Sequence, residues 1–91
     1  MSNNVMHYVQ NEGDVRLKAT EAVHSIGVTG FTIRNTTTCI DARYLGNFQW
    51  NVQFHTPGNV EIFNTDSRSL EKGIMKNFVA NEKGLEVFVY R

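Results

Sequence analysis

The sequence predicts a single α+β domain in two layers: a mostly antiparallel sheet of about five to six strands, with two helices on one face. Three observations lead to this fold class. Apolar residues recur at helical spacing in 14–26 and again in 67–77, residues 28–64 alternate between apolar and polar, and the alternation returns in 85–90. The 91 residues match the usual length of one domain, so we assign 1–91 to one unit.

The first predicted helix covers about residues 14–26. Its apolar positions share one face: Val15, Ala19, Ala22, Val23 and Ile26. Asn11 or Asp14 can cap its start, and Gly27 follows its last apolar residue, where a left-handed cap residue is expected. Before it, we expect residues 1–4 to be a disordered end. Residues 5–10 fit either a short strand or a lead-in to this helix.

The segment 28–64 predicts four strands. Phe31 and Ile33 alternate with polar residues, and 36–44 is rich in β-branched residues, with 45–47 as a turn. In 36–44, Ile40, Ala42 and Tyr44 share one face, and Cys39, Asp41 and Arg43 share the other. The clearest strand has Phe48, Trp50, Val52 and Phe54 on one side and Gln49, Asn51, Gln53 and His55 on the other. This pattern is typical of a half-buried strand.

A turn at 56–59 leads into a returning strand that carries Val60, Ile62 and Asn64. Pro57 and Gly58 favour the turn, because proline presets φ and glycine accepts a positive φ. The second helix covers about 67–77, with Leu70, Ile74 and Phe78 on the sheet side. Residues 78–80 are expected to start a closing hairpin, with a turn at 81–84 and a strand at 85–90. The predicted order is α-β-β-β-β-α-β-β.

The motifs of catalysis and of metal or phosphate binding are missing from the sequence. Cys39 is the one cysteine, and spacing brings none of the three histidines to it. CxxC, HxH, HxxxH, GxGxxG and GxxxxGK motifs do not occur. We therefore predict a protein that is not an enzyme, with no catalytic residues, no metal and no cofactor.

The composition excludes some classes of protein and favours one cellular location. Nine lysines and arginines balance nine acidic residues, which excludes a strongly basic DNA-wrapping protein and an acidic DNA mimic. The longest apolar run is four residues, so no membrane span is expected. A single cysteine cannot form an internal disulfide, which favours a cytoplasmic location.

The second helix carries a row of three cations. Arg68, Lys72 and Lys76 repeat every four residues and are offset by two from the apolar stripe, so they line the helix face opposite the sheet. Such a row can follow a phosphate backbone. It can equally be an ordinary solvated helix face.

The polar side of the central strand is the other candidate site. This side carries Gln49, Asn51, Gln53 and His55, and it is flanked by Arg43 and Glu61 on neighbouring strands. Its amides can read base edges, form a protein interface or simply face water. Phe63, Phe88 and Tyr90 fall on this same side. If the helices cover only the other face, these aromatics are exposed anchors. If the helices divide between both faces, they are buried.

The segment 44–91, and Gly58-Asn59-Val60-Glu61-Ile62-Phe63 in particular, resembles the C-terminal domain of the middle-promoter transcription activator of T-even-type bacteriophages. The resemblance implies a double-wing-like fold that binds DNA through its sheet and wings. The family domain is basic, whereas residues 43–91 here carry six lysines and arginines against five acidic residues.

Two hypotheses follow, with DNA binding first. In the first, the chain is a small phage-type module that binds double-stranded DNA or modulates transcription. Phosphates would be held by Arg34, Arg43, Arg68, Lys72, Lys76 and Lys83, and bases by Gln49, Asn51 and Gln53. In the alternative, it is a phage-encoded inhibitor that binds a host or defence protein through Phe63, Phe88 and Tyr90. Both place it in the bacterial host cytoplasm, as a monomer or as a homodimer paired through an edge strand.

Overall fold

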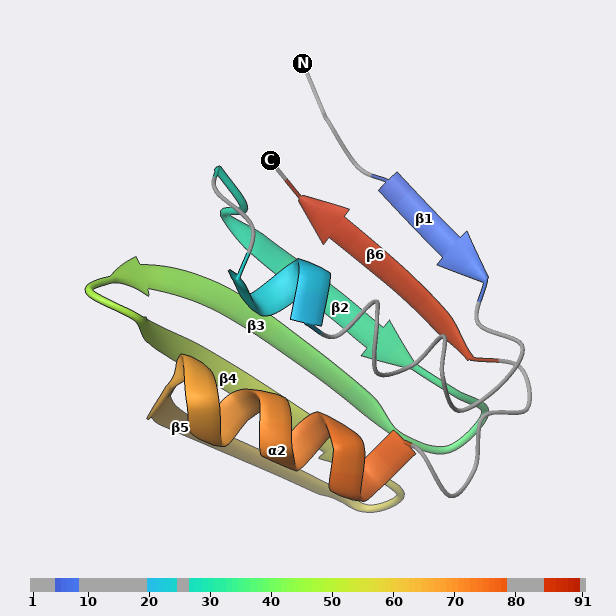
Figure 1. The fold of residues 1–91 in the computed structure, drawn as a ribbon. Helices are drawn as coiled ribbons and strands as arrows, with labels where there is room; N and C mark the ends of the chain where they lie inside the picture. Colours follow the sequence, from blue (N-terminus) through green and yellow to red (C-terminus); the bar gives the residue numbers. More distant parts are fainter. Residues whose placement is uncertain (1–4, 9–19, 25–26, 79–84, 91) are drawn as a thin grey trace.

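A computed structural model describes residues 5–8, 20–24, 27–78 and 85–90. Its six strands form one antiparallel sheet in the order β1-β6-β2-β3-β4-β5. The strands are β1 (Val5–Tyr8), β2 (Gly30–Arg34), β3 (Cys39–Gly46), β4 (Gln49–Thr56), β5 (Asn59–Asp66) and β6 (Glu86–Tyr90). The helix α2 (Ser67–Phe78) and the helical segment 20–24 lie on the same side of the sheet (Figure 1). The predicted α+β class and the order from first helix to β6 are confirmed.

The chain ends differ from the expectation in one respect. Residues 5–8 form β1, the choice that the sequence left open, whereas residues 1–4, 9–19, 25–26, 79–84 and 91 lie outside the described part. The prediction that Phe78 opens a closing hairpin is wrong, because Phe78 is the last residue of α2 and is fully buried. Strand β6 instead pairs with β1 and β2. The sixth strand is therefore supplied by the start of the chain.

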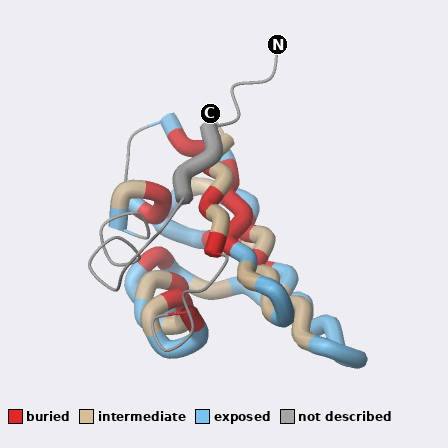
Figure 2. The backbone as a smooth tube through the Cα atoms, turned by 90° about the vertical axis from the view of Figure 1, so that its right-hand side faces the viewer, coloured by how far each residue is buried: buried red, intermediate tan, exposed pale blue. Residues whose placement is uncertain are grey.

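The hydrophobic core lies between the helices and one face of the sheet. Alternate residues of β2, β3, β4 and β6 point into it and meet Ala22, Val23, Leu70 and Ile74 from the helices. Figure 2 shows the buried positions gathered inside the molecule and exposed positions at the loops that project from it. Because both helices lie on the same side of the sheet, no described helix covers the opposite face.

The register of β5 corrects the predicted positions of Phe63 and Glu61. Strands β4 and β5 are joined by the predicted Pro57–Gly58 turn, with Gly58 at φ +77°. The ladder that starts there places Phe63 opposite Val52 and Glu61 opposite Phe54. Directly opposite residues share a face, so both side chains lie on the helix side and not beside the amides. Val60 and Ile62 lie on the polar face instead.

Phe48 also departs from the prediction that it points inward with Trp50. Asn47 and Phe48 form the turn between β3 and β4, at φ values of +52° and +61°. Two left-handed residues are typical of a two-residue hairpin turn, but an aromatic residue adopts this conformation at a cost. Hydrogen bonds hold it: the Phe48 amide donates to the Tyr44 hydroxyl at 3.0 Å, and the Ser67 amide donates to the Phe48 carbonyl at 2.8 Å.

Trp50 joins this turn to the start of α2. Its ring is buried, edge-on to Phe31 at 5.2 Å between centroids, and its Nε1 donates to Ser67 Oγ at 2.8 Å. Ser67 Oγ in turn donates to the Phe48 carbonyl at 3.3 Å. The first residue of α2 thus satisfies the polar atom of the largest core side chain.

We expect Ser67→Ala to destabilise the fold, because it leaves the buried indole N–H of Trp50 without its acceptor. The expected loss in free energy of unfolding is about 1–3 kcal/mol. Urea unfolding followed by the fluorescence of Trp50, the one tryptophan of the chain, measures it. Thr36→Ala, at an exposed loop position, is the matched control and should stay within about 0.5 kcal/mol of wild type. Equal losses in the two variants would contradict the role given to Ser67.

Asp66 caps α2, and its contribution should depend on pH. The Ser69 amide donates to Asp66 Oδ1 at 2.8 Å, and this bond lowers the pKa of the Asp66 carboxyl from its ordinary 3.8. A lowered folded pKa means that the stabilisation is complete above 3.8 and is lost as the pH falls through the lowered value. Asp66→Ala should therefore reduce the melting temperature near neutral pH.

The gap in melting temperature between wild type and Asp66→Ala should then shrink as the pH is lowered below 3.8. Asp66→Asn is the control, because an asparagine can still cap a helix but does not titrate in this range. A gap that stays constant down to about pH 2 would show that the charge of Asp66 plays no part.

Candidate binding face of the sheet

The side of the sheet that faces away from the helices, here called the open face, is built by cross-strand register. Rows of directly opposed residues run across β6, β2, β3 and β4. The three rows are Glu86, Arg34, Cys39 and His55; Phe88, Thr32, Asp41 and Gln53; and Tyr90, Gly30, Arg43 and Asn51. Strand β5 extends them with Val60, Ile62 and Asn64. The prediction that Arg43, Phe88 and Tyr90 lie on the same side of the sheet as the amides of β4 agrees with this register.

A hollow of about 430 Å³ opens on this face above Gly30. A Cβ at Gly30 would lie 2.8 Å from the Ala42 carbonyl oxygen, so glycine is the residue that this close strand pairing accepts. Without a side chain at its centre, the row leaves a floor of backbone. The hollow is bordered by Thr32, Asp41, Arg43, Asn51, Gln53 and Tyr90.

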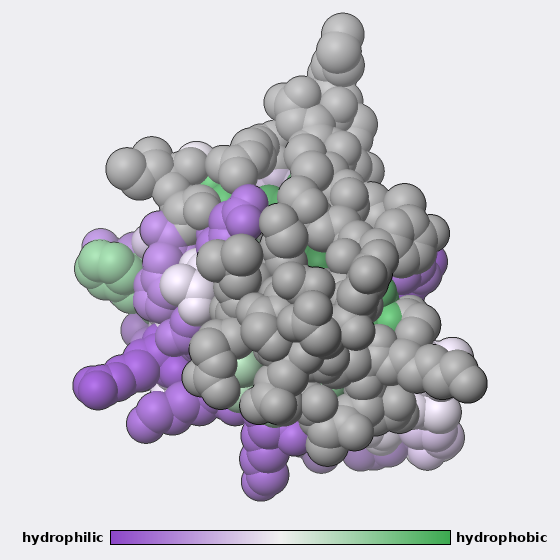
Figure 3. All heavy atoms as spheres, turned by 45° about the vertical axis from the view of Figure 1, so that its right-hand side comes forward, coloured by the Kyte–Doolittle hydropathy of each residue, from purple (hydrophilic) through white to green (hydrophobic). Residues whose placement is uncertain are grey.

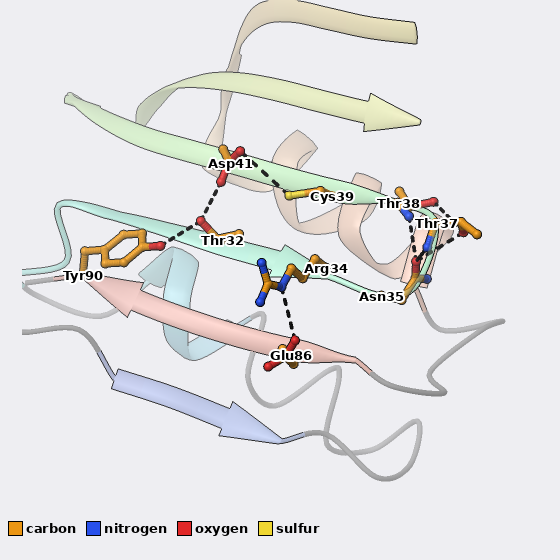
Figure 4. A network of polar contacts seen from close by, with 9 residues as sticks. All are labelled: Thr32, Arg34, Asn35, Thr37, Thr38, Cys39, Asp41, Glu86 and Tyr90. Atoms are coloured by element: carbon orange, nitrogen blue, oxygen red, sulfur yellow. Dashed lines mark hydrogen bonds and ion pairs between the residues drawn. The ribbon is translucent and has the colours of Figure 1, made fainter. Parts of the chain in front are cut away.

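Hydrogen bonds fix one wall of the hollow. Thr32 Oγ1 donates to Asp41 Oδ1 at 2.6 Å and lies 3.0 Å from the Tyr90 hydroxyl (Figure 4). Since the threonine proton goes to the carboxylate, the tyrosine hydroxyl donates to Thr32 Oγ1. Tyr90 is thereby held in place before any ligand arrives.

The neighbouring row offers less to a ligand. Arg34 Nε donates to Glu86 Oε1 at 3.2 Å, and the Arg34 guanidinium carbon lies 5.0 Å from the centre of the Phe88 ring. The cation is therefore already paired, and the ring already carries a cation above it. Of the two arginines on this face, Arg43 is the one that forms no ion pair with another described residue.

The sheet brings a histidine to Cys39, a contact that the spacing of these residues along the chain does not predict. His55 lies directly opposite Cys39 on β4, and both approach Asp41 Oδ2: Cys39 Sγ at 3.8 Å and His55 Nε2 at 3.5 Å. Burial, and then the Asp41 charge, raise the pKa of the Cys39 thiol to about 11. The thiol donates toward the acid rather than to the imidazole, and near neutral pH it is protonated. Nucleophilic catalysis instead needs a thiol that gives its proton to the imidazole and is deprotonated near neutral pH.

We expect Asp41→Asn to lower the pKa of Cys39, because it removes a nearby negative charge and keeps an acceptor for Thr32. The value should fall below about 11 but stay above the ordinary 9.0, since burial is the larger cause. The rate of iodoacetamide alkylation between about pH 7 and 9 should rise accordingly. Arg34→Gln is the control of opposite sign, because the Arg34 charge lowers this pKa. Faster alkylation in both variants would point to loosened packing instead.

The cations of α2 lie on the other layer of the molecule. Arg68, Lys72 and Lys76 are exposed, on the helix face turned away from Leu70 and Ile74. Figure 3 shows long hydrophilic side chains projecting at the lower left of the molecule. Glu71, on the same helix, accepts a hydrogen bond from Thr20 Oγ1 at 2.6 Å and contacts His24 at 3.3 Å.

The predicted DNA-binding residues therefore divide between two surfaces. Arg34, Arg43, Gln49, Asn51 and Gln53 belong to the open face, whereas the row on α2 belongs to the opposite side. Lys83 lies outside the described residues. Of the three predicted aromatic anchors, Phe88 and Tyr90 lie on the open face and Phe63 does not. No single straight duplex contacts both surfaces at once.

Comparisons with known proteins add no relative. A scan against protein-family models and searches of curated proteins and of solved structures found no match. The resemblance to the phage activator domain thus remains a prediction. Among the described residues, no helix is long and apolar enough to cross a membrane, and no group of three or more His, Cys, Asp and Glu side chains is arranged to hold a metal ion.

Proposed function

We propose that this protein is a non-catalytic binding module whose open face holds a partner protein, centred on the hollow above Gly30. The observation that carries this proposal is the prearranged hollow itself. Its floor is bare backbone, its Tyr90 wall is fixed by Thr32, and its rim offers Arg43, Asn51 and Gln53. Rigid aromatic and arginine side chains beside adaptable amides are typical of the centre of protein interfaces.

The charge of the open face favours a protein partner over duplex DNA. Across β2, β3, β4 and β6 the two arginines are matched by Asp41 and Glu86. Arg34 is also already engaged with Glu86 at 3.2 Å. Affinity for DNA comes chiefly from cations that replace the counterions of phosphates. A face whose positive and negative charges are equal in number gains little affinity for DNA in this way, whereas it suits a protein surface of mixed charge.

The side chains that border the hollow indicate which groups of a partner protein would bind there. Arg43 can pair with a carboxylate of the partner, and the amides of Asn51 and Gln53 can each donate and accept. A loop that inserts an acidic or amide side chain into the hollow would use all three. The contact would bury Arg43, which makes that residue the expected centre of the binding energy.

Duplex DNA is the second candidate, now through α2 alone. Arg68, Lys72 and Lys76 are exposed, form no ion pair with another described residue and repeat at about 6 Å. Such a row could hold phosphates without any contribution from the sheet.

A pair of charge reversals separates the two candidates. Tagged wild type, Arg43→Glu and Lys72→Glu are used to capture proteins from bacterial lysate, and each is titrated with duplex DNA at about 50 and 200 mM salt. We expect a stoichiometric protein partner that Arg43→Glu binds at least about tenfold more weakly and that Lys72→Glu retains. The two variants change the charge equally, so each controls for the other.

The opposite pattern would overturn the proposal. If wild type binds duplex DNA with an affinity that falls steeply with salt, and Lys72→Glu but not Arg43→Glu abolishes that binding, the helix row is the functional surface. A captured protein that binds Arg43→Glu as tightly as wild type would also show that the hollow is not the binding site.

A further inference from the structure

We propose that two copies of this chain pair through β5, edge to edge and antiparallel, in a register centred on Ile62. Strand β5 forms one edge of the sheet, and within the described residues no strand lies against its outer side. It is eight residues long, whereas the strand at the other edge, β1, has four. This proposal rests on the edge alone and is independent of the partner proposed for the open face.

Strand β5 lacks most of the features that usually prevent edge pairing, although Glu61 places a charge within it. Its sequence NVEIFNTD contains neither proline nor lysine, and its ladder with β4 has no bulge. Three large hydrophobic side chains are exposed on it: Val60 at 54%, Ile62 at 65% and Phe63 at 42%. An edge of this kind is a template for another strand.

The hairpin register determines which backbone groups point outward. Residues that flank a two-residue turn form a hydrogen-bonded pair, and the pairs of an antiparallel ladder then alternate. Thr56 and Asn59 flank the turn and form the first hydrogen-bonded pair. The backbone N–H and C=O groups of Val60, Ile62 and Asn64 therefore point away from β4. These alternate groups are the ones that a second strand needs.

The sequence of β5 is complementary to itself in the register centred on Ile62. When the pairing is centred on Ile62, this residue opposes its own copy, Val60 opposes Asn64 and Glu61 opposes Phe63. A register centred on Glu61 would place two carboxylates opposite each other, which is unfavourable. The register centred on Ile62 keeps like charges apart and places the two exposed Ile62 side chains opposite each other.

Symmetry limits the assembly to two copies. The same edge on each copy forms the contact, so a two-fold axis closes it. Pairing of β5 with β1 of another copy would instead join two different edges, and it would form a ring or an open chain of copies rather than a dimer. A strand of eight residues provides less area than the roughly 1,200–2,000 Å² of a standard stable interface, so we expect a dimer that forms at micromolar or higher concentration.

Sedimentation velocity over about 10 µM to 1 mM tests the proposal. The wild-type mass should approach twice that of the monomer as the concentration rises. Ile62→Lys should remain monomeric over the same range, with an unchanged circular dichroism spectrum, because this side chain is exposed. Leu45→Lys is the matched control: Leu45 is also an exposed aliphatic residue, at 53%, but lies on β3, and its dimer should persist.

Disulfide trapping tests the register. In a Cys39→Ser background, Ile62→Cys should crosslink two chains on oxidation, because a hydrogen-bonded pair places its Cα atoms about 5.5 Å apart, within disulfide reach. Phe63→Cys should crosslink far more slowly, since in this register its two copies are offset by two residues, about 8 Å.

Each of four outcomes would overturn the proposal. These are a monomer at every concentration, a mass that grows beyond two copies, equal loss of the dimer in Leu45→Lys and Ile62→Lys, or crosslinking of Phe63→Cys at the rate of Ile62→Cys.

Discussion

The hydrogen bond from Trp50 Nε1 to Ser67 Oγ is the constraint on which the arrangement of this protein depends. It satisfies the polar atom of the largest buried side chain, and the acceptor is the first residue of α2. Ser67 also contacts the Phe48 carbonyl through its amide and its hydroxyl. One serine thus links the indole, the β3–β4 turn and the helix start, and this fixes the start of α2 against the face of β4 that carries Trp50.

Because α2 covers one face of the sheet, the residues that can bind a partner are those of the open face. With Trp50 and Val52 turned toward α2, the alternation of β4 leaves Gln49, Asn51 and Gln53 on the open face. Gly30 on β2 then creates the hollow, because its strand pairing leaves no room for a side chain at that point. The candidate site therefore follows from core packing and one close backbone approach, and it requires no loop of its own.

Local pattern was enough to predict some parts of this molecule and not others. The structure confirms the apolar stripe of Leu70, Ile74 and Phe78 and the alternation of β4. Both patterns are reliable because each element buries one side. Phe63 was misplaced because β5 is an edge strand, where hydrophobicity does not report burial: Ile62 is exposed. The contacts of Thr32 with Tyr90 and of Cys39 with His55 depend on strand order and register, which no local period encodes.

The two proposed contacts use different chemistry and need not compete. A partner on the open face meets side chains, whereas pairing through β5 uses backbone groups at the edge. A two-fold axis perpendicular to the sheet turns both open faces to the same side. The two hollows would then lie seven strand spacings apart, roughly 30 Å along a twisted sheet. A dimer of this geometry binds a repeated or symmetric partner far more tightly than either copy alone, because the second contact becomes intramolecular.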